Sequence, residues 1–465
     1  MTQAYRERIR ELSLRVVEAQ RPIRILDAIK WDDSVCDFFV RTDFKEIPPW
    51  GPEIYQRVPL RFEPEAKIRQ FEEIRRSIPL LLGKRDRVGE ILTRNCCEFE
   101  DAVRMIQARG TPQFYRYARM LYGSPKDLLG DGLTTLRQLS LMLDEILTSI
   151  AKTRLGVNYP KLIPAEDVVS ELNRRLAGYF HENAVHVKLD DGIVSDAAAG
   201  SDYIKIKRGA LFSTRDIDIL EVHEGWVHVG TTINGQLQPW ACWLSKGPPC
   251  VTATQEGLTV IMEIFAFVSL PSRVKRLNNR IRACDMVEDG ANVVEILDFF
   301  RQQDCTPAEA LMHTQRIFRG GVFTGGAPFT KDISYCKGFV LIYNFLRSAI
   351  RFGRPELIPL LFAGKLTLED IPVLYELLKE GILIGPRYLP RQFSDLDGLA
   401  AWMAFSNFLN RMDLSRIQDY FRREVLGLPL PPGEGRGEAT PADLSPARLL
   451  PPLPPHDSTD VGKLP

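Results

Sequence analysis

The sequence of 465 residues lacks several features that mark common classes of protein. It has no run of eighteen or more apolar residues, so no membrane-spanning helix and no membrane partner are expected. Lysine plus arginine and aspartate plus glutamate both number 60, and this zero net charge gives no reason to expect a nucleic-acid partner. The first twenty residues mix arginine and glutamate without the apolar stretch of a signal peptide. These absences predict a cytoplasmic protein.

Cysteine is sparse and shows no pattern. The eight cysteines include no C-x-x-C pair, which disfavours a zinc-finger or thioredoxin-like motif. In a reducing compartment such residues serve mostly as small buried hydrophobes. Cys242 and Cys250 flank a loop next to the candidate site described below, where a ligand set is complete without them.

Apolar residues recur with helical spacing through most of the chain, which predicts a mainly helical protein. We expect a mainly helical N-terminal lobe over residues 1–180. Residues 181–427 are expected to form a core with C-terminal helices, in one continuous unit with that lobe. Residues 428–465 are rich in proline, glycine and small polar residues, and predict a disordered tail.

Two short segments alternate as strands do. Residues 184–189 alternate, turn at residues 190–192 and resume at residues 193–194, and residues 203–207 alternate again. The pattern predicts an α+β fold with a small antiparallel β-sheet, whose edge near residues 203–207 could hold an extended peptide. Ser213, with Asp216 three residues later, fits the cap of the helix that follows.

The chain has only six histidines, and two of them, His223 and His228, flank Glu224 closely in sequence. Metalloproteases commonly carry H-E-x-x-H, in which the histidines are four residues apart on one helix face. Here the spacing is five, which separates the side chains by about 140° on a regular α-helix. A π-type turn restores the alignment, and Gly225 is the natural position for such a distortion. The motif is therefore compatible with a zinc site if the helix is bulged or frayed there.

A third ligand is available one loop later, in Glu256. Two imidazoles and a carboxylate form a catalytic zinc set that leaves the fourth position to water. Glu224 would then be the base that takes the proton of that water. Gly257 would allow close backbone approach, and Glu263 is either an alternative ligand or the partner that orients a histidine. The competing interpretation of these residues is a buried structural His–Glu network.

Four ordered motifs resemble the QEGLA-motif proteins, whose bacterial members are labelled flavohemoglobin expression-modulating. The similarity extends over about residues 10–425 and includes the related microtubule-associated tyrosine carboxypeptidases. The motifs are His223-Glu224-Gly225-Trp226-Val227-His228, Thr254-Gln255-Glu256-Gly257-Leu258, Arg316-Ile317-Phe318-Arg319-Gly320-Gly321, and Phe329-Thr330-Lys331-Asp332 with Tyr335 and Gly338. Thr259 departs from the alanine that the family name implies.

The resemblance implies a gluzincin-like zinc metallopeptidase with one zinc ion per chain. It assigns His223, His228 and Glu256 as ligands and Glu224 as a catalytic residue. The implied activity is that of a carboxypeptidase acting on a peptide or protein C-terminus, without identifying tubulin as the substrate. The alternatives are a non-catalytic regulatory protein that modulates gene expression indirectly, and a metal-dependent hydrolase of a non-peptide substrate.

A carboxypeptidase also needs groups that bind the terminal carboxylate of its substrate. Arg316, Arg319 and Lys331 flank a glycine-rich loop and are the candidates for substrate binding. Tyr335 is a second catalytic candidate, as a donor to the developing oxyanion. The alternative is that the arginines are structural or solvated and that the tyrosine is packed.

Overall fold

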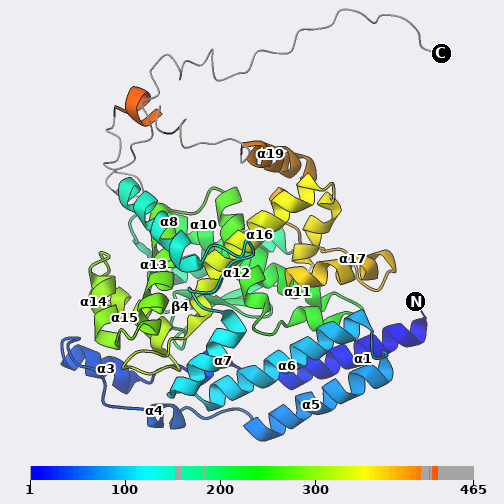
Figure 1. Cartoon of the computed structure of the whole chain (residues 1–465), viewed down its shortest axis with the longest axis horizontal. Coiled ribbons are helices and arrows are strands. Elements are labelled where there is room, and N and C mark those ends of the chain that lie inside the picture. The colour runs from blue at the N-terminus through cyan, green and yellow to red at the C-terminus, as the bar shows by residue number, and fades with distance from the viewer. Residues whose placement is uncertain (1, 152–158, 182–184, 410–417, 419–420, 428–465) are drawn as a thin grey trace, which may run out of the picture. The chain divides into compact units, whose positions relative to one another are not determined.

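The computed structural model describes residues 2–151, 159–181, 185–409, 418 and 421–427 (Figure 1). The chain divides into two compact units, Met1–Met403 and Ala404–Pro465, and the candidate site lies in the first. The predicted tail over residues 428–465 lies outside the described residues, and the predicted division at residue 180 stays a prediction. Among the described residues, no helix combines the length and apolar character needed to cross a bilayer.

Helices form most of the described chain and two small sheets accompany them, which confirms the mainly helical α+β class. The α-helices are α1 (Gln3–Gln20), α2 (Ile25–Ala28), α3 (Asp33–Arg41), α4 (Glu53–Gln56), α5 (Pro64–Leu81), α6 (Arg87–Gln107), α7 (Pro112–Tyr122), α8 (Leu136–Ala151), α9 (Ala165–Tyr179), α10 (Thr214–Leu220), α11 (Gly230–Gln236), α12 (Val251–Phe265), α13 (Pro271–Glu288), α14 (Val293–Arg301), α15 (Pro307–Phe318), α16 (Ser334–Arg351), α17 (Ile371–Lys379), α18 (Arg391–Ser394) and α19 (Leu396–Leu409). The 3₁₀ and π segments are η1 (Glu221–Val229), η2 (Cys242–Ser245), η3 (Thr330–Ile333), η4 (Pro355–Phe362), η5 (Leu368–Asp370) and η6 (Phe421–Val425).

The first helices pack side by side, with α1 and α5 both against α6 (Figure 1). Helix α5 buries Ile68, Phe71 and Ile74, whose three-residue spacing places them along one side of the helix. The carboxylates of Glu63 and Asp86 cap α5 and α6 by accepting hydrogen bonds from backbone N–H groups of the first turn. The apolar periodicity of the sequence and the capping residues therefore both indicate the helices found in this part of the chain.

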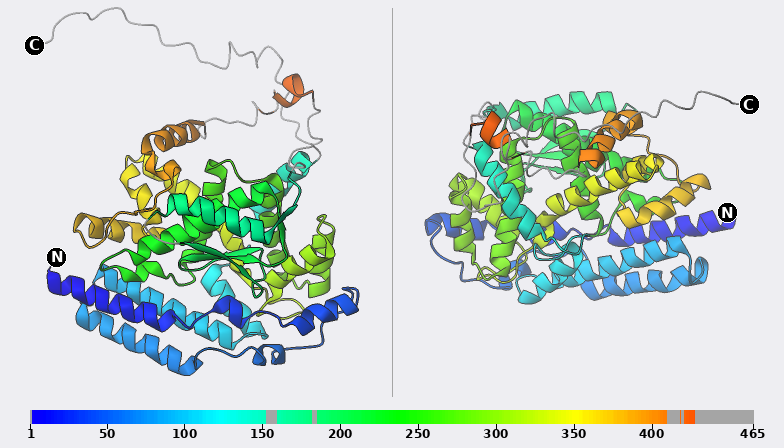
Figure 2. Two further views of the ribbon diagram at one scale, coloured as in Figure 1. Left: turned by 180° about the vertical axis from the view of Figure 1, so that it is seen from behind. Right: turned by 45° about the horizontal axis from the view of Figure 1, so that its top comes forward.

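A three-stranded sheet lies next to the π-helical segment η1. Its strands are β2 (His186–Asp190), β3 (Ala197–Ala199) and β4 (Tyr203–Lys207), in the order β2-β4-β3. Helix α9 covers one face of it, with Val168, Leu172 and Leu176 in the same core cluster as β4 (Figure 2). A separate antiparallel pair joins β1 (Ile163–Pro164) to β5 (Leu211–Phe212).

The predicted antiparallel topology of the sheet is wrong in one pairing. Strand β3 is antiparallel to β4, but β2 runs parallel to it. Residues 191–196 do not form a hairpin and lead the chain to the other side of β4, where residues 200–202 make the tight turn. Strand β4 is therefore central, so the predicted peptide-binding edge at Tyr203–Lys207 is wrong. The edge strand that contacts η1 is β3.

Helices α10, η1 and α11 follow one another without interruption from residue 214 to residue 236. The predicted cap is confirmed: Ser213 accepts a hydrogen bond from the backbone N–H of Asp216, and the Asp216 carboxylate accepts one from the Ser213 backbone. Helix α12 packs against both η1 and α16, so this long helix, α12 and α16 together form the frame of the candidate site.

Candidate metal centre

The π-type turn predicted from the histidine spacing is confirmed. Residues Glu221–Val229 form a π-helix, and its extra residue per turn brings His223 and His228 to the same side. Their ring centroids are 5.0 Å apart with an interplanar angle of 84°. Gly225 contributes mainly through packing, since a Cβ there would stand 2.6 Å from Cδ2 of Leu176 on α9.

Glu256 reaches the histidines from α12. The predicted close approach at Gly257 is confirmed, and the neighbouring backbone is that of Gly338 on α16. A Cβ on Gly257 would stand 2.1 Å from the carbonyl carbon of Gly338. The absence of both side chains therefore brings the start of α16, including Tyr335, close to the turn of α12 that carries Glu256.

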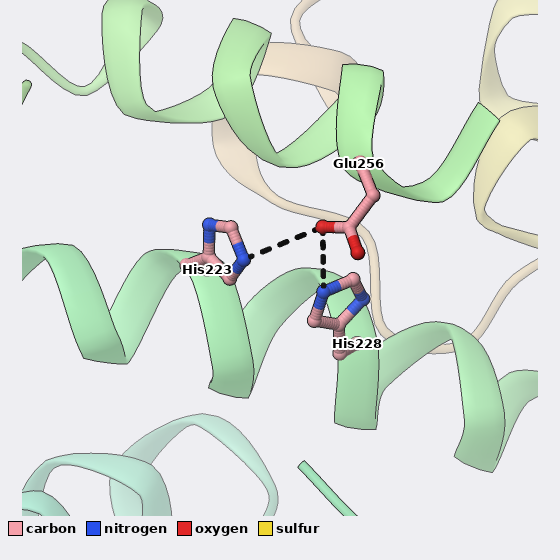
Figure 3. Close-up of side chains that lie close together, drawn as sticks. All are labelled: His223, His228 and Glu256. Carbon is pink, nitrogen blue, oxygen red and sulfur yellow. Dashed lines mark ion pairs between the residues drawn. The ribbon is translucent and has the colours of Figure 1, made fainter. Parts of the chain in front are cut away.

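His223, His228 and Glu256 converge on one point (Figure 3). Oε2 of Glu256 lies 3.7 Å from Nε2 of His223 and 3.5 Å from Nε2 of His228. Zinc bonds of about 2.0–2.1 Å in tetrahedral geometry would place ligand atoms about 3.3–3.4 Å apart. The Glu256 Oε2 atom is buried and has no hydrogen-bond partner among the described residues. The three residues therefore fit a single metal ion, which would satisfy this orphaned oxygen.

The other oxygen of Glu256 is held by Lys331, whose Nζ donates to Oε1 at 2.9 Å. Burial disfavours the charged form of Glu256, but Lys331 and the two histidines outweigh it and hold the pKa well below its ordinary value. The carboxylate is thus ionised, with one oxygen used by the lysine and the other facing the two imidazoles.

Glu263 stands behind His223, on the side away from Glu256. Its Oε1 lies 2.7 Å from Nδ1 of His223, and Arg273 donates to both carboxylate oxygens at 2.6 Å. Burial opposes the charge of Glu263, but Arg273 and His223 lower its pKa to about 2. An ionised carboxylate can only accept, so Nδ1 carries the proton and the lone pair of Nε2 faces Glu256. Glu263 orients a histidine and is outside the candidate ligand group.

Glu224 borders the same space. Its Oε1 lies 3.9 Å from Nε2 of His223, and its Oε2 accepts a hydrogen bond from the backbone N–H of Ala199 at 2.9 Å. Strand β3 therefore fixes one oxygen of the glutamate and leaves the other on the side of the histidines. Glu224 therefore lies next to the candidate ligands without belonging to the candidate ligand group.

The predicted substrate-binding side chains have different environments. Nε and Nη2 of Arg316 donate to Asp332 at 2.6 and 3.0 Å, so most of this guanidinium is occupied by a buried ion pair. Arg319 is buried against the ring of Phe329, and its Nε has no hydrogen-bond partner among the described residues. Burial and the nearby charge of Arg316 lower the pKa of Arg319 to about 10. Arg319 is thus the more available cation.

Tyr335 packs against one member of the candidate metal group, with its ring stacked on that of His223 at a centroid distance of 6.2 Å. Burial and the Glu256 carboxylate raise its pKa, so the hydroxyl remains protonated at neutral pH. Two cations approach the ring: Arg280 at 5.6 Å and Lys331 at 5.8 Å from its centroid. The ring of Tyr335 is therefore adjacent to His223 and carries a protonated hydroxyl.

Sequence reasoning missed three cations of the site. Arg273 and Arg280 come from α13, and Lys365 follows η4. Their partners are ten or more residues away in sequence, so no local motif marks them. The spacing of seven between Arg273 and Arg280, which puts both on one helix face, is the one signal present.

The fold and the site together define a mainly helical α+β protein with a buried group able to hold one metal ion. Residues 37–411 match the family described as microtubule-associated tyrosine carboxypeptidase. Because this match covers more than half of the chain, the chain belongs to that family. The predicted relation to these carboxypeptidases is confirmed, and the QEGLA name of the bacterial members stays a prediction.

Other comparisons add little. A crystal structure of a protein from Colwellia psychrerythraea, described as a lipoprotein, is similar with a TM-score of 0.38 and 12% identity. The similarity covers 73% of this chain and 70% of that one, and it is too low to bear on function. No curated protein matches the chain.

Proposed function

We propose that the chain is a cytoplasmic, zinc-dependent carboxypeptidase of gluzincin-like fold that removes residues from the C-terminus of a peptide or protein. One observation carries the proposal: the buried oxygen of Glu256 faces two imidazole nitrogens without a hydrogen-bond partner among the described residues. The family name points to a carboxypeptidase, and to tyrosine as a terminal residue worth testing. No observation favours the regulatory alternative.

His223, His228 and Glu256 would hold one zinc ion. When bound, zinc supplies a Lewis acid that polarises a carbonyl and makes water more acidic. The carboxylate of Glu224 takes the proton of the attacking water and passes it to the leaving amine. The N–H of Ala199 keeps this carboxylate in place during both transfers, since it bonds the oxygen that faces away from His223.

The remaining groups bind and orient the substrate. The hydroxyl of Tyr335, kept protonated by burial, donates to the oxygen that becomes negative as the carbonyl is attacked. Arg319 is the best candidate for the terminal carboxylate, because its buried Nε has no hydrogen-bond partner among the described residues, whereas Arg316 is paired with Asp332. Lys331 adds positive charge beside Glu256, and Arg316 acts mainly through Asp332.

The proposal is tested by metal content and by product analysis. Wild type and His186→Ala, which changes an exposed histidine of β2, are expected to contain about one zinc per chain, and His228→Ala none. Peptides ending in tyrosine or in other residues are then incubated with each protein, and mass spectrometry follows loss of the last residue. A folded wild type without metal, or peptide loss that persists in His228→Ala, would refute the proposal.

A further inference from the structure

Lys365 joins the two segments that carry the candidate metal ligands. Its Nζ donates to the backbone carbonyl of His228 at 3.0 Å, to Oγ1 of Thr231 at 3.0 Å and to Oε1 of Gln255 at 2.7 Å. Burial and the nearby charge of Lys246 lower the pKa of Lys365 to about 7, and in its charged form all three protons of the amine are used. The acceptors on His228 and Thr231 belong to the continuous helix formed by η1 and α11, and Gln255 immediately precedes Glu256 on α12.

The carbonyl of His228 lies near the end of the π-helical segment, which finishes at Val229. A π-helix is rare as a regular structure and persists where surrounding contacts favour it. Besides Lys365, the hydroxyl of Thr232 donates to this same carbonyl at 2.8 Å. These side-chain donors stabilise the segment at the residue whose imidazole must turn toward His223.

The main chain and stem of Lys365 are held in place by close packing. Its backbone N–H donates to the carbonyl of Leu244 at 2.7 Å. A Cβ on Gly364 would stand 2.6 Å from that carbonyl oxygen, and a Cβ on Gly247 would stand 2.9 Å from Cβ of Lys365. Gly247 thus leaves space for the stem of Lys365, and Gly364 allows the chain to approach the Leu244 carbonyl closely.

We propose that Lys365 is a positioning residue for the metal centre, which holds the π-helical register of His228 and locks it to α12. The inference rests on the proposed metal site. Each ligand then has a supporting basic side chain: Arg273 acts through Glu263 on His223, Lys331 donates to Glu256, and Lys365 donates to the His228 backbone. Without Lys365, a relaxation of the segment toward α-helix would turn the imidazoles about 140° apart.

The test measures metal affinity apart from catalysis. Wild type and Lys365→Met are stripped with a chelator and titrated with Co²⁺, and visible absorption bands report both occupancy and coordination. We expect the dissociation constant of Lys365→Met to rise about tenfold or more, with altered bands, because outer partners of metal ligands typically contribute that much. Zinc affinity, measured by competition with a chromophoric chelator, should change in the same direction.

Arg109→Met is the matched control. Arg109 also joins two separate segments, because it donates to the backbone carbonyls of Ala28 and Val58, but it lies outside the site. Both variants are expected to lower the melting temperature of the metal-free protein, and only Lys365→Met should weaken metal binding. An unchanged dissociation constant in Lys365→Met would reduce the lysine to a general stabiliser and overturn the inference.

A second variant covers the case in which Lys365→Met does not fold. Gln255→Leu removes one acceptor and keeps the ammonium, and it too should weaken Co²⁺ binding and alter the bands. Affinity equal to that of wild type in this variant would contradict the proposed lock between the helices. If wild type itself binds no metal, the proposed function fails together with this inference, whereas equal binding by wild type and variants refutes the role of Lys365 alone.

Discussion

Gly257 and Gly338 face each other where α12 and α16 meet, and neither position has room for a side chain. A Cβ on Gly338 would stand 1.9 Å from the carbonyl oxygen of Ala253, closer than any real contact allows. Glu256 and Tyr335 lie one and three residues from these glycines. The two helices are therefore packed through their backbones at the level of the candidate metal group.

Gly338→Ala is expected to destabilise the protein by at least about 1–3 kcal/mol, because the extra methyl group forces the helices apart. Metal affinity should fall with it, since Glu256 moves with α12. Urea unfolding of the metal-free protein gives the first quantity, and Co²⁺ titration gives the second. Gly178→Ala is the control: this exposed helical glycine of α9 has nothing within 4 Å of a new Cβ, and the change should stabilise by about 0.5–1 kcal/mol.

Glu224→Gln should keep zinc and lose peptidase activity by about 10²–10⁴-fold. The amide oxygen can still accept the hydrogen bond of Ala199, so the side chain stays in place while its capacity to take a proton is lost. Metal analysis and peptide cleavage, measured on the same preparation, separate the two properties. Glu221 lies in the same π-helix but is paired with Arg175, so Glu221→Gln should retain both zinc and peptidase activity. Cleavage by Glu224→Gln at the wild-type rate would exclude Glu224 as the base.

Glu263→Gln should weaken metal binding by about 10–100-fold, because an outer carboxylate fixes the tautomer and orientation of His223. It should also cost about 3–5 kcal/mol of stability, since Arg273 is left buried without its counter-charge. Co²⁺ titration and urea unfolding measure these effects. Glu376→Gln breaks an equally short but exposed pair with Arg87 and should cost no more than about 1 kcal/mol. If Glu263→Gln changed metal affinity and stability no more than Glu376→Gln does, Glu263 would have no special role in orienting His223.

Asp332→Asn tests the buried ion pair beside the site. Burial opposes the charge of Asp332, but Arg316 and Arg280 outweigh it and hold the pKa well below its ordinary value. Because the pKa in the folded state is below the unfolded value of about 3.9, the charged form stabilises the fold above about pH 4. That stabilisation is lost as the pH falls further, toward the pKa of the folded state.

In Asp332→Asn the free energy of unfolding should therefore fall less steeply than in wild type as the pH decreases below about 4. Near pH 7 it should be lower than that of wild type by about 3–5 kcal/mol. Urea unfolding between pH 7 and pH 3 measures both. Asp43→Asn removes an exposed partner of Lys45 at a positive φ that asparagine accepts, and should leave the profile nearly unchanged. A wild-type profile in Asp332→Asn would mean that the pair contributes nothing to the pH dependence.

The sequence predicted the parts of this site that follow from local geometry. If both histidines bind one ion, their five-residue spacing requires a π-type turn by arithmetic on helix turns, and Ser213 with Asp216 forms a cap through contacts three residues apart. The helical class follows from periodicity in the same way. Each of these predictions needs only neighbours within one or two turns.

What the sequence did not reveal depends on contacts between distant segments. The direction of β2 is decided by the path of residues 191–196 around β4, which alternation of side chains does not encode. Lys365 meets Gln255 across 110 positions, and neither residue belongs to a spacing rule. Arg316 stands in a motif with Arg319, yet its pairing with Asp332 distinguishes the two only in three dimensions.

The π-helical segment also sets the rotational phase between the two halves of one continuous helix. Its extra residue turns everything after Val229 relative to everything before Glu221, so α10 and α11 present faces that a regular helix would not offer together. Deleting one residue between His223 and His228 would restore the common four-residue spacing, but would rotate Asn234 by about 100°. Asn234 would then lose its hydrogen bonds to the carbonyls of Phe362 and Tyr388. The five-residue spacing is therefore required by the packing of the core as well as by the position of the candidate ligands.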